Sequence, residues 1–278
     1  MSKLHFDYWM ELNFTEVVTE SHYTIKCLPK DTDMQRISDV NINIIPENSF
    51  QNGEDSFGNL TVYGNVLEPH NKFGFHISGN AETNLSNGET VREDEYTGIY
   101  LYPYGLNKAG EEIKDYFEKI VPDFDAEKLS NSNEKELCST NYEKAKILMS
   151  HLHEDFTYES GSTNMSTTAE EAFRQRKGVC QDYAHILIAL CQLAKIPARY
   201  VAGMMVGEGY SHAWVEVLSD GIWYALDPTH ACEAKENYIK IGVGRDAEDC
   251  MINKGILKGG GMQTQEIRVL VEELPVEV

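Results

Sequence analysis

The sequence predicts an α+β protein with two domains: an all-β domain of sandwich or barrel type over residues 1–104, and a domain over residues 105–278 in which helices are followed by an antiparallel sheet. Two observations lead to this prediction. A length of 278 residues fits two domains of about 100 to 200 residues each. Near Tyr104 the spacing of apolar residues changes from the alternation of strands to the three- and four-residue steps of helices.

The first domain is expected to contain short strands joined by tight turns. Residues 23–28 and 40–46 alternate apolar and polar side chains, as in a sheet with one face in water. Asn52-Gly53, Phe57-Gly58-Asn59 and Asn87-Gly88 are turn residues typical of hairpins. Aromatic and branched residues between these turns indicate further strands.

The second domain should begin after a linker at residues 102–107 and should contain three helices before its strands. Residues 141–155 have the pattern of an amphipathic helix. Residues 167–173 offer a threonine followed three residues later by an acid, which predicts a capping box at the start of a short helix. A broad apolar face predicts a third helix over residues 178–193. Strands are then expected over residues 198–204, 213–217, 222–226 and 266–271.

The charge of the chain argues against several classes of partner. The chain has 24 Lys and Arg residues and 45 Asp and Glu residues, so its net charge is 24 − 45 = −21. No basic run is present to bind phosphates. Neither nucleic acid nor a membrane is therefore expected as a partner. The longest apolar stretch, residues 184–194, is shorter than the roughly 20 residues of a membrane-spanning helix. The first residues carry acids where a signal peptide has its apolar core, so we expect a cytoplasmic protein. Its six cysteines contain no CxxC pair and are expected to be free thiols.

Cys180 is the candidate nucleophile. It stands at the predicted start of a largely apolar helix, where unpaired backbone N–H groups and the positive end of the helix dipole favour a thiolate. Gly178 lets the chain turn sharply into the helix and leaves the sulfur accessible. Cys191, deep in the same helix, is expected to be buried. Asp182 is interpreted as a partner of the helix dipole, and His185 as a packed or surface residue.

His212 and Asp227 are the candidate base and the group that orients it. They flank a predicted hairpin that turns at residues 218–221, with Asp220-Gly221 as the turn signal. A four-residue loop would place them directly opposite each other and a two-residue loop diagonally, and both put them on one face of the sheet. A three-residue loop would separate them. Asp227 precedes Pro228, which ends the strand where a carboxylate can reach an imidazole.

A cysteine at a helix start, a histidine on a strand and an aspartate on the next strand follow the order of a thiol triad. The surrounding segments are residues 176–185 (RKGVCQDYAH), 196–203 (IPARYVAG), 211–217 (SHAWVEV) and 223–229 (WYALDPT). In these segments the chain resembles the transglutaminase-like branch of the papain-type cysteine enzymes. Its Phe57-Gly58-Asn59 turn and Gly244-Arg245-Asp246 segment resemble a bacterial subgroup with a β-rich N-terminal domain, so the likeness covers nearly the whole chain.

The resemblance implies a fold and a role for individual residues. The fold would be papain-like, with the helix of the nucleophile packed on an antiparallel sheet. Cys180 would be the nucleophile, His212 the general base and then acid, and Asp227 the group that fixes the imidazole tautomer. The backbone N–H of Cys180 would be one donor to the oxyanion, with Tyr158 or Gln175 as the second. Neither a metal nor a cofactor is implied.

Two departures count against crosslinking by the arrangement of the animal enzymes. Those enzymes carry a Trp directly after the nucleophile, where this chain has Gln181, and no Trp lies between Trp9 and Cys180. Nothing in the sequence builds a site for a second amine. We therefore expect an amide hydrolase or acyl transferase of the peptidase or glutamine deamidase type, acting through a thioester on a peptide or protein substrate. The alternatives are an amine-incorporating crosslinking transglutaminase and an inactive binding module, and the oligomeric state is left open.

Other candidate residues have simpler interpretations. His151 and His153 could ligate a metal in a metal-dependent hydrolase, but residues two apart on a helix point in different directions, so a polar helix end is expected. Glu93-Asp94-Glu95 lacks the spacing of a calcium loop and is interpreted as a solvated turn. Trp214 shares a face with His212 and is expected either to line the substrate site or to be a core aromatic residue.

Overall fold

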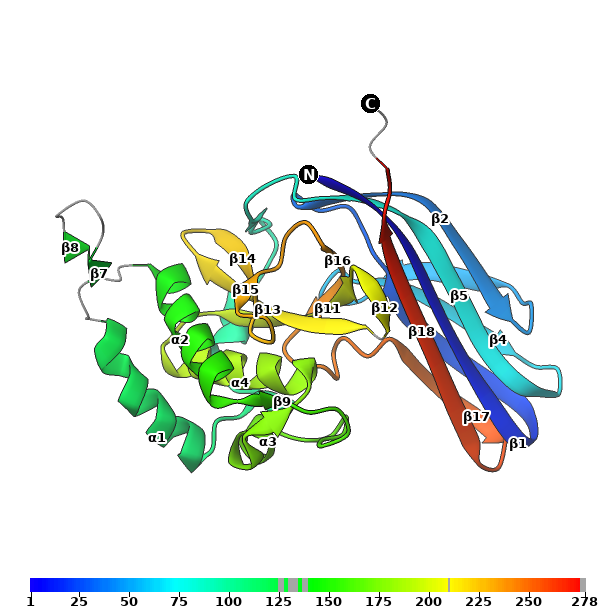
Figure 1. The fold of residues 1–278 in the computed structure, drawn as a ribbon. Helices are drawn as coiled ribbons and strands as arrows, with labels where there is room; N and C mark the ends of the chain where they lie inside the picture. The colour runs from blue at the N-terminus through cyan, green and yellow to red at the C-terminus, as the bar shows by residue number, and fades with distance from the viewer. Residues whose placement is uncertain (125–127, 130–134, 137–139, 210, 276–278) are drawn as a thin grey trace.

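The computed structural model describes residues 1–124, 128–129, 135–136, 140–209 and 211–275. They form two β-sheets and a group of helices, and the second sheet lies between the helices and the first sheet (Figure 1). Val215 and Val217 on one face of the second sheet pack with the helices. Ile239 and Ile241 belong to the core of the first sheet. The second sheet is thus covered on both faces.

The first sheet is built on one long strand, β1 (Ser2–Leu28), which has 27 residues. It includes the strand predicted over residues 23–28 and begins far upstream of it. Every second side chain from Leu4 to Phe14 is buried, as alternation requires in a strand with one face toward a core.

The two halves of β1 pair with different strands. The first half lies between β5 (His70–Thr83) and β18 (Gln263–Glu273), and the second half between β4 (Leu60–Val66) and β17 (Asn253–Gly259). Apolar side chains from both halves share one core, so the sheet folds over on itself. The eight-stranded sheet is completed by β2 (Gln35–Ile45), β3 (Phe50–Glu54) and β12 (Gly207–Gly209).

The second sheet has the strand order β15-β14-β13-β11-β16, and a short strand β6 pairs with β14. Its neighbours are all antiparallel. The three strands predicted over residues 198–204, 213–217 and 222–226 are confirmed. The bounds are β6 (Glu89–Thr90), β11 (Ala198–Met205), β13 (His212–Ser219), β14 (Ile222–Asp227), β15 (Cys232–Glu233) and β16 (Tyr238–Gly244).

Four α-helices lie beside this sheet: α1 (Glu111–Ile120), α2 (Asn141–Asp155), α3 (Ala169–Gln175) and α4 (Cys180–Leu193). The predictions of α2, α3 and α4 are confirmed, and α1 was not predicted. Within the described residues, no helix has the length and apolar character needed to cross a membrane. Short elements are η1 (Thr97–Leu101), η2 (Gly105–Asn107), η3 (Val121–Phe124), β7 (Lys128–Leu129), β8 (Lys135–Glu136), β9 (Thr157–Tyr158) and β10 (Lys177–Gly178).

The division of the chain at residue 104 differs from the sheets that the structure forms. The strand predicted over residues 266–271 exists, but it lies in β18, which pairs with β1 in the first sheet. Conversely, β6 comes before residue 104 and pairs with the second sheet. Alternating polarity identifies a strand without identifying its partner, so the sequence pattern could not assign these segments to a sheet.

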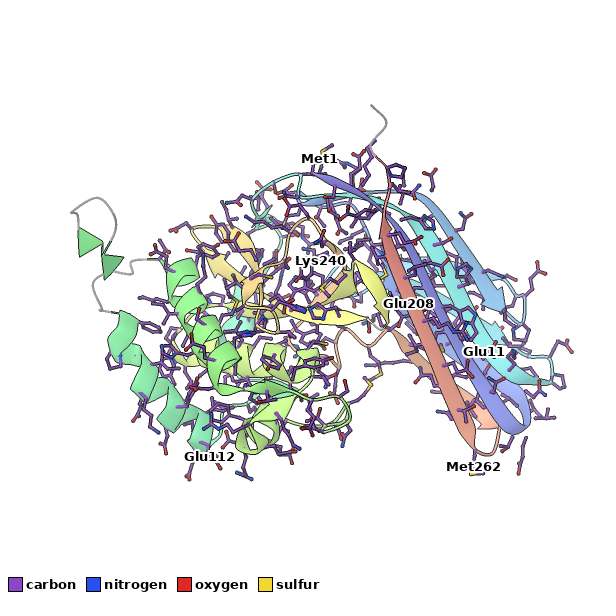
Figure 2. The ribbon with its side chains drawn as sticks, viewed as in Figure 1. Met1, Glu11, Glu112, Glu208, Lys240 and Met262 are labelled. Carbon is purple, nitrogen blue, oxygen red and sulfur yellow. The ribbon has the colours of Figure 1, made fainter. Side chains whose placement is uncertain are left out.

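Two amide side chains of the first domain bind the free edge of β16. The Asn59 amide donates to the Val243 carbonyl at 2.7 Å and accepts from the Val243 N–H at 2.8 Å. Gln35 makes the same pair of bonds with the backbone of Lys240, both at 2.8 Å. Lys240 lies where the two sheets meet (Figure 2). The Phe57-Gly58-Asn59 turn therefore serves to join the two sheets, because Asn59 satisfies peptide groups that an edge strand would leave unpaired.

Candidate active site

Cys180 is the first residue of α4, as predicted, and it is partly exposed. The helix behind it is almost entirely buried, and Cys191 lies in that buried part. The Asp182 carboxylate closes the helix start by accepting from the Val179 N–H at 2.8 Å and from the Thr163 hydroxyl at 2.6 Å. This capping holds the end of the helix that carries the thiol. The described cysteines are all free thiols: Cys27, Cys180, Cys191, Cys232 and Cys250.

Gly178 serves a different purpose from the one predicted. It lies in β10, outside the positive-φ residues of the described chain, so no sharp turn requires it. A Cβ atom at this position would lie 2.5 Å from Oδ2 of Asp182. The glycine therefore leaves room for the carboxylate that caps α4, which a larger residue would displace.

His212 and Asp227 meet as the hairpin predicts. The turn has two residues, Asp220 and Gly221, with φ angles of 52° and 79° that suit a tight hairpin turn. Ser219 pairs with Ile222, which places His212 and Asp227 diagonally on one face. Nε2 of His212 lies 2.8 Å from Oδ2 of Asp227.

The imidazole of His212 links the thiol to the carboxylate. Because Nε2 is bonded to Asp227, Nδ1 is the ring nitrogen that remains to interact with Cys180. Burial by itself would lower the pKa of His212, but the hydrogen bonds and charges of Asp227 and Cys180 outweigh it and raise that pKa to about 9. At neutral pH the protonated ring is therefore favoured beside the Asp227 carboxylate.

Asp227 is fully buried and accepts four hydrogen bonds. Its Oδ2 accepts from His212, from His230 at 2.7 Å and from the Tyr238 hydroxyl at 2.8 Å, while Oδ1 accepts from the Thr229 N–H at 2.8 Å. Burial alone would raise the pKa of Asp227, but the bonds from His212, His230 and Tyr238 hold that pKa well below its usual range. The Asp227 carboxylate therefore keeps its charge although it is itself closed to water.

Sequence reasoning missed His230 and Tyr238. His230 follows Asp227 by three residues, so its spacing was a signal that could have been used. Tyr238 begins β16, which is separated from β14 in the sheet by β13 and β11, and only the packed structure brings its hydroxyl to Asp227.

Trp214 packs behind the site and does not line it. Its side chain is only 2% exposed, and its ring lies 6.3 Å from that of His212 and 5.4 Å from that of Tyr238. A Cβ atom on Gly203, in the neighbouring strand, would lie 2.2 Å from the Trp214 ring, so the glycine makes room for it. Of the two roles expected for Trp214, its burial favours a core aromatic residue that supports the imidazole over one that lines the substrate site.

Tyr158 and Gln175, the candidates for the second oxyanion donor, lie in different elements. Tyr158 is 53% exposed and pairs in the β9–β10 ladder with Gly178, two residues before Cys180. Gln175 is exposed at the far end of α3. The role of either residue as the second oxyanion donor stays a prediction.

The polar cluster around Asp227 is built as a hydrogen-bond network. Ligand atoms of His212, Asp227 and His230 lie within 4.8 Å of one another and could in principle hold a metal ion. However, one ring nitrogen of His212 and one of His230 both bond to the same oxygen of Asp227. These nitrogens are therefore already used in hydrogen bonds and are not free as metal ligands. His153 lies 3.3 Å from the Pro228 carbonyl, and the described residues bring no third ligand to His151 and His153.

Glu95 corrects the interpretation of Glu93-Asp94-Glu95 as a solvated turn. Its side chain is only 9% exposed and lies 2.7 Å from the guanidinium of Arg199, which also bonds to Glu216. Asp94 stays exposed. The reason is Arg199, a buried cation that attracts an acidic side chain from a segment distant in sequence.

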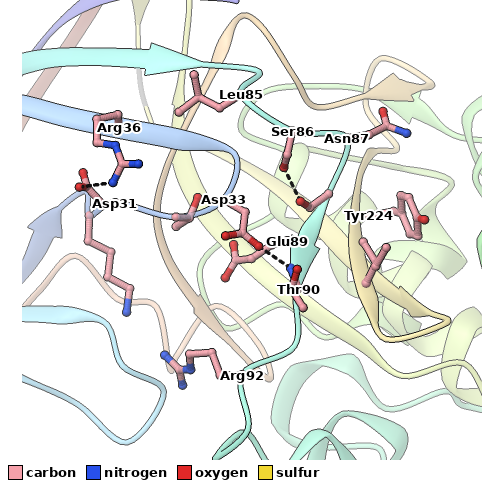
Figure 3. Close-up of a pocket in the computed structure, with 14 residues that line it drawn as sticks. Asp31, Asp33, Arg36, Leu85, Ser86, Asn87, Glu89, Thr90, Arg92 and Tyr224 are labelled. Atoms are coloured by element: carbon pink, nitrogen blue, oxygen red, sulfur yellow. Dashed lines mark hydrogen bonds and ion pairs between the residues drawn. The ribbon is translucent and has the colours of Figure 1, made fainter.

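A separate hollow of about 750 Å³ lies away from this site (Figure 3). It is formed by the turn before β2 and the segment around β6. Its charged groups are already paired: Arg36 bonds to Asp31 at 2.8 Å, and the Thr90 N–H donates to Asp33 at 2.9 Å. Cys180 is not among the residues that line it. Size alone therefore does not identify the candidate site.

Comparison with known proteins agrees with this architecture. Residues 131–228 match the Transglutaminase-like superfamily, and residues 5–82 match the Bacterial transglutaminase-like N-terminal region. An uncharacterized protein of Mycobacterium tuberculosis is 28% identical over 300 residues, which cover 96% of this chain and 91% of that protein. A protein-glutamine gamma-glutamyltransferase of Pseudomonas aeruginosa is 31% identical over 121 residues, or 37% of this chain and 18% of that protein.

A solved structure shares the fold over the whole chain. It is "a Putative Cysteine Protease from Cytophaga hutchinsonii", with a TM-score of 0.75 and 22% identity, covering 100% of this chain and 92% of that one. Residues 131–228 are therefore a transglutaminase-like core, and residues 5–82 are a bacterial transglutaminase-like N-terminal region.

Proposed function

We propose that the protein is a thiol-dependent amide hydrolase that uses Cys180, His212 and Asp227 as a triad. The single observation that carries this proposal is the position of His212, whose Nε2 lies 2.8 Å from the buried Asp227 carboxylate and whose pKa is raised in part by the Cys180 thiol nearby. A nucleophile, a base and a group that orients the base are the minimum for covalent acyl transfer. Peptide bonds and glutamine side chains are the amides considered.

The first half-reaction forms a thioester. The Cys180 sulfur bonds to the carbonyl carbon while the C=O π electrons move to oxygen, which the Cys180 N–H stabilises. When the oxyanion collapses, the C–N bond breaks and the imidazolium of His212 gives its proton to the departing amine or ammonia. Tyr158 is the second proposed donor to the oxyanion.

The second half-reaction regenerates the thiol. His212, now neutral, takes a proton from water as the water oxygen bonds to the thioester carbon. The C–S bond then breaks, a carboxylic acid leaves, and the proton on His212 restores the ion pair with the sulfur. Asp227 stays ionised throughout and holds the ring with Nδ1 toward the sulfur.

Amine incorporation is the second candidate. The similarity of 121 residues to a protein-glutamine gamma-glutamyltransferase favours it, because the same thioester would then react with a lysine amine in place of water. We place hydrolysis first because the described site has no assigned pocket for a second amine. An inactive binding module would retain the geometry without the chemistry.

The proposal is tested in two steps. Iodoacetamide labelling near pH 6 should be rapid at Cys180 in the native chain, slow in His212→Ala and absent at that site in Cys180→Ala. Cys232→Ala, which removes another partly exposed thiol, is the matched control and should label Cys180 normally.

The second step identifies the reaction. A library of glutamine- and lysine-containing peptides is incubated with the protein and analysed by mass spectrometry, where cleavage, deamidation and an amine adduct have distinct masses. Labelling of Cys180 no faster than that of an ordinary exposed thiol, together with an unchanged library, would contradict the proposal and favour the binding module.

A further inference from the structure

We infer that a cavity beside the candidate site binds a large apolar side chain of the substrate, within a few residues of the amide that Cys180 attacks. This inference rests on the proposed function and adds a substrate class to it: peptides or proteins with an apolar residue flanking the target amide. The cavity has a volume of about 410 Å³. That size lies within the ~300–1,000 Å³ of ligand-binding pockets.

The cavity adjoins the catalytic residues on two sides. Ser211, on its wall, directly precedes His212. Met165, also on its wall, accepts a hydrogen bond at 3.4 Å through its carbonyl from Gln181, which directly follows Cys180. An extended peptide advances about 3.3 Å per residue, so a substrate held at the thiol reaches the cavity within a few residues.

The opposite wall comes from the first sheet. Met10, Phe14 and Tyr23 of β1 form part of it, together with Phe73 of β5. These side chains are otherwise buried in the core of the first sheet, so the cavity opens onto that core. Strand β17 supplies Ile256, which is 77% exposed. The first sheet and two segments next to the catalytic residues therefore line one cavity, although Cys180 itself is not among its lining residues.

The chemistry of the wall selects an uncharged occupant. No Asp, Glu, Lys or Arg is among the described residues that line it, although the chain has a net charge of −21. Its polar groups are hydroxyls, amides and the ring of His22, and that ring bonds to Glu20 at 2.9 Å. A carboxylate or ammonium group entering the cavity would lose its hydration without an ion-pair partner, whereas an aromatic or aliphatic side chain would gain burial.

The experiment uses two synthetic peptides and the full chain. Both peptides have one central glutamine in a Gly/Ser background. One has Phe at the second, third and fourth positions on each side of the glutamine, and the other has Glu at those positions. We expect the native chain to act on the Phe peptide with a kcat/KM roughly ten- to one-hundred-fold above that for the Glu peptide, as expected for burial of one large apolar side chain.

Rim variants test the location. Ile256→Glu and Met165→Glu should each reduce that preference at least several-fold, because both place a carboxylate at the cavity wall. Both residues are exposed, so neither change removes a core contact. Met262→Glu is the matched control: Met262 lies at the tip of the β17–β18 hairpin (Figure 2), is 77% exposed like Ile256, and does not line the cavity. It should keep the native preference.

Failure of the cavity and failure of the triad give different results. Turnover of both peptides with no Phe preference, or with a preference that Ile256→Glu leaves unchanged, would overturn the cavity and leave the triad intact. A binding measurement covers the case in which the triad fails and the cavity does not. The Phe and Glu peptides are labelled with fluorescein, and their binding to Cys180→Ala is measured by fluorescence anisotropy. Selective binding of the Phe peptide that Ile256→Glu abolishes, without turnover by the native chain, would support the cavity and overturn the catalytic proposal. Neither turnover nor selective binding would overturn both.

Discussion

Two buried carboxylates on the β13–β14 hairpin are neutralised in different ways. Asp227 accepts hydrogen bonds from two imidazoles, a phenol and a backbone N–H. Glu216, in β13, bonds to the guanidinium of Arg199 at 2.6 Å and to the ammonium of Lys240 at 2.9 Å. Residues 212, 214 and 216 share one face of β13 because side chains alternate, so the two clusters are close neighbours.

The difference lies in whether the partners can change their charge. The Arg199 guanidinium does not titrate in the physiological range, and Glu89 and Glu95 add further acids to the cluster of Arg199, Lys240 and Glu216. The Arg199 guanidinium also stacks on the Trp223 ring, 4.3 Å from its centroid. The donors around Asp227 are neutral or titratable, which a site that moves a proton requires. We conclude that the Glu216 cluster serves to hold the strands of the second sheet together, and that the Asp227 cluster is available for chemistry.

Removal of the charge at Asp227 should have the largest effect. Asp227→Asn should lower kcat/KM by about 10³- to 10⁴-fold, because the imidazolium loses its counter-charge and the ring its preferred tautomer. Steady-state hydrolysis of the preferred peptide measures the loss. Asp220→Asn, at the turn of the same hairpin, is the control and should be near native. A loss below tenfold in Asp227→Asn would show that the two clusters do not differ in function.

Removal of the cation at Arg199 should lower the free energy of unfolding and leave the reactivity of the Cys180 thiol unchanged. Arg199→Met leaves buried acids facing one cation, and urea unfolding should show a loss of about 3–5 kcal/mol. The rate of Cys180 labelling should stay native under conditions where the variant is folded. Arg174→Met removes an exposed pair with Glu112 and should cost under about 1 kcal/mol. Equal losses in the two variants would contradict a structural role for the buried cluster.

The pH dependence of stability should report the raised pKa of His212. Burial opposes protonation, but Asp227 and Cys180 raise this pKa to about 9, so the folded state holds the proton more tightly than the unfolded state. The resulting stabilisation is complete below about pH 6.5 and is lost as pH rises through about 9. The stability difference between the native chain and His212→Gln should therefore shrink by roughly 3 kcal/mol from pH 6 to pH 9.5. A difference that stays constant over this range in urea titrations would refute the proposed charge state.

Removal of the Tyr238 hydroxyl should have the smallest effect. Tyr238→Phe takes one of four hydrogen bonds from Asp227, worth about 0.5–1.5 kcal/mol, so kcat/KM should fall roughly two- to tenfold. Tyr224→Phe, in the adjoining hairpin strand, is the control. A loss as large as that of Asp227→Asn would mean that Tyr238 contacts the reacting groups directly and does more than position the carboxylate.

Local sequence patterns predicted the parts of the site that depend on local geometry. The period of apolar residues placed α2 and α4, and the Asp220-Gly221 turn placed His212 and Asp227 on one face. The alternation from Leu4 to Phe14 was also present in the sequence and would have predicted the start of β1. In these regions each residue is constrained by neighbours only a few positions away.

Other features depend on segments far apart in the chain. The pairing of β17 and β18 with β1, the burial of Glu95 against Arg199 and the contact of Tyr238 with Asp227 join residues whose own neighbourhoods contain no sign of the partner. Burial also decided between two expectations, because Trp214 lies on the predicted face but is buried as a core aromatic residue.

The sequence by itself determined where helices and strands run, which side chains share a face, and which cysteine begins a helix, because these follow from periodicity and turn chemistry along a short stretch of chain. The tertiary structure alone decided which strands pair across the two sheets, which charges are removed from water and which surface faces the thiol. Those outcomes depend on the packing of distant segments, and the free energy of a charged or apolar group is set by what surrounds it in space.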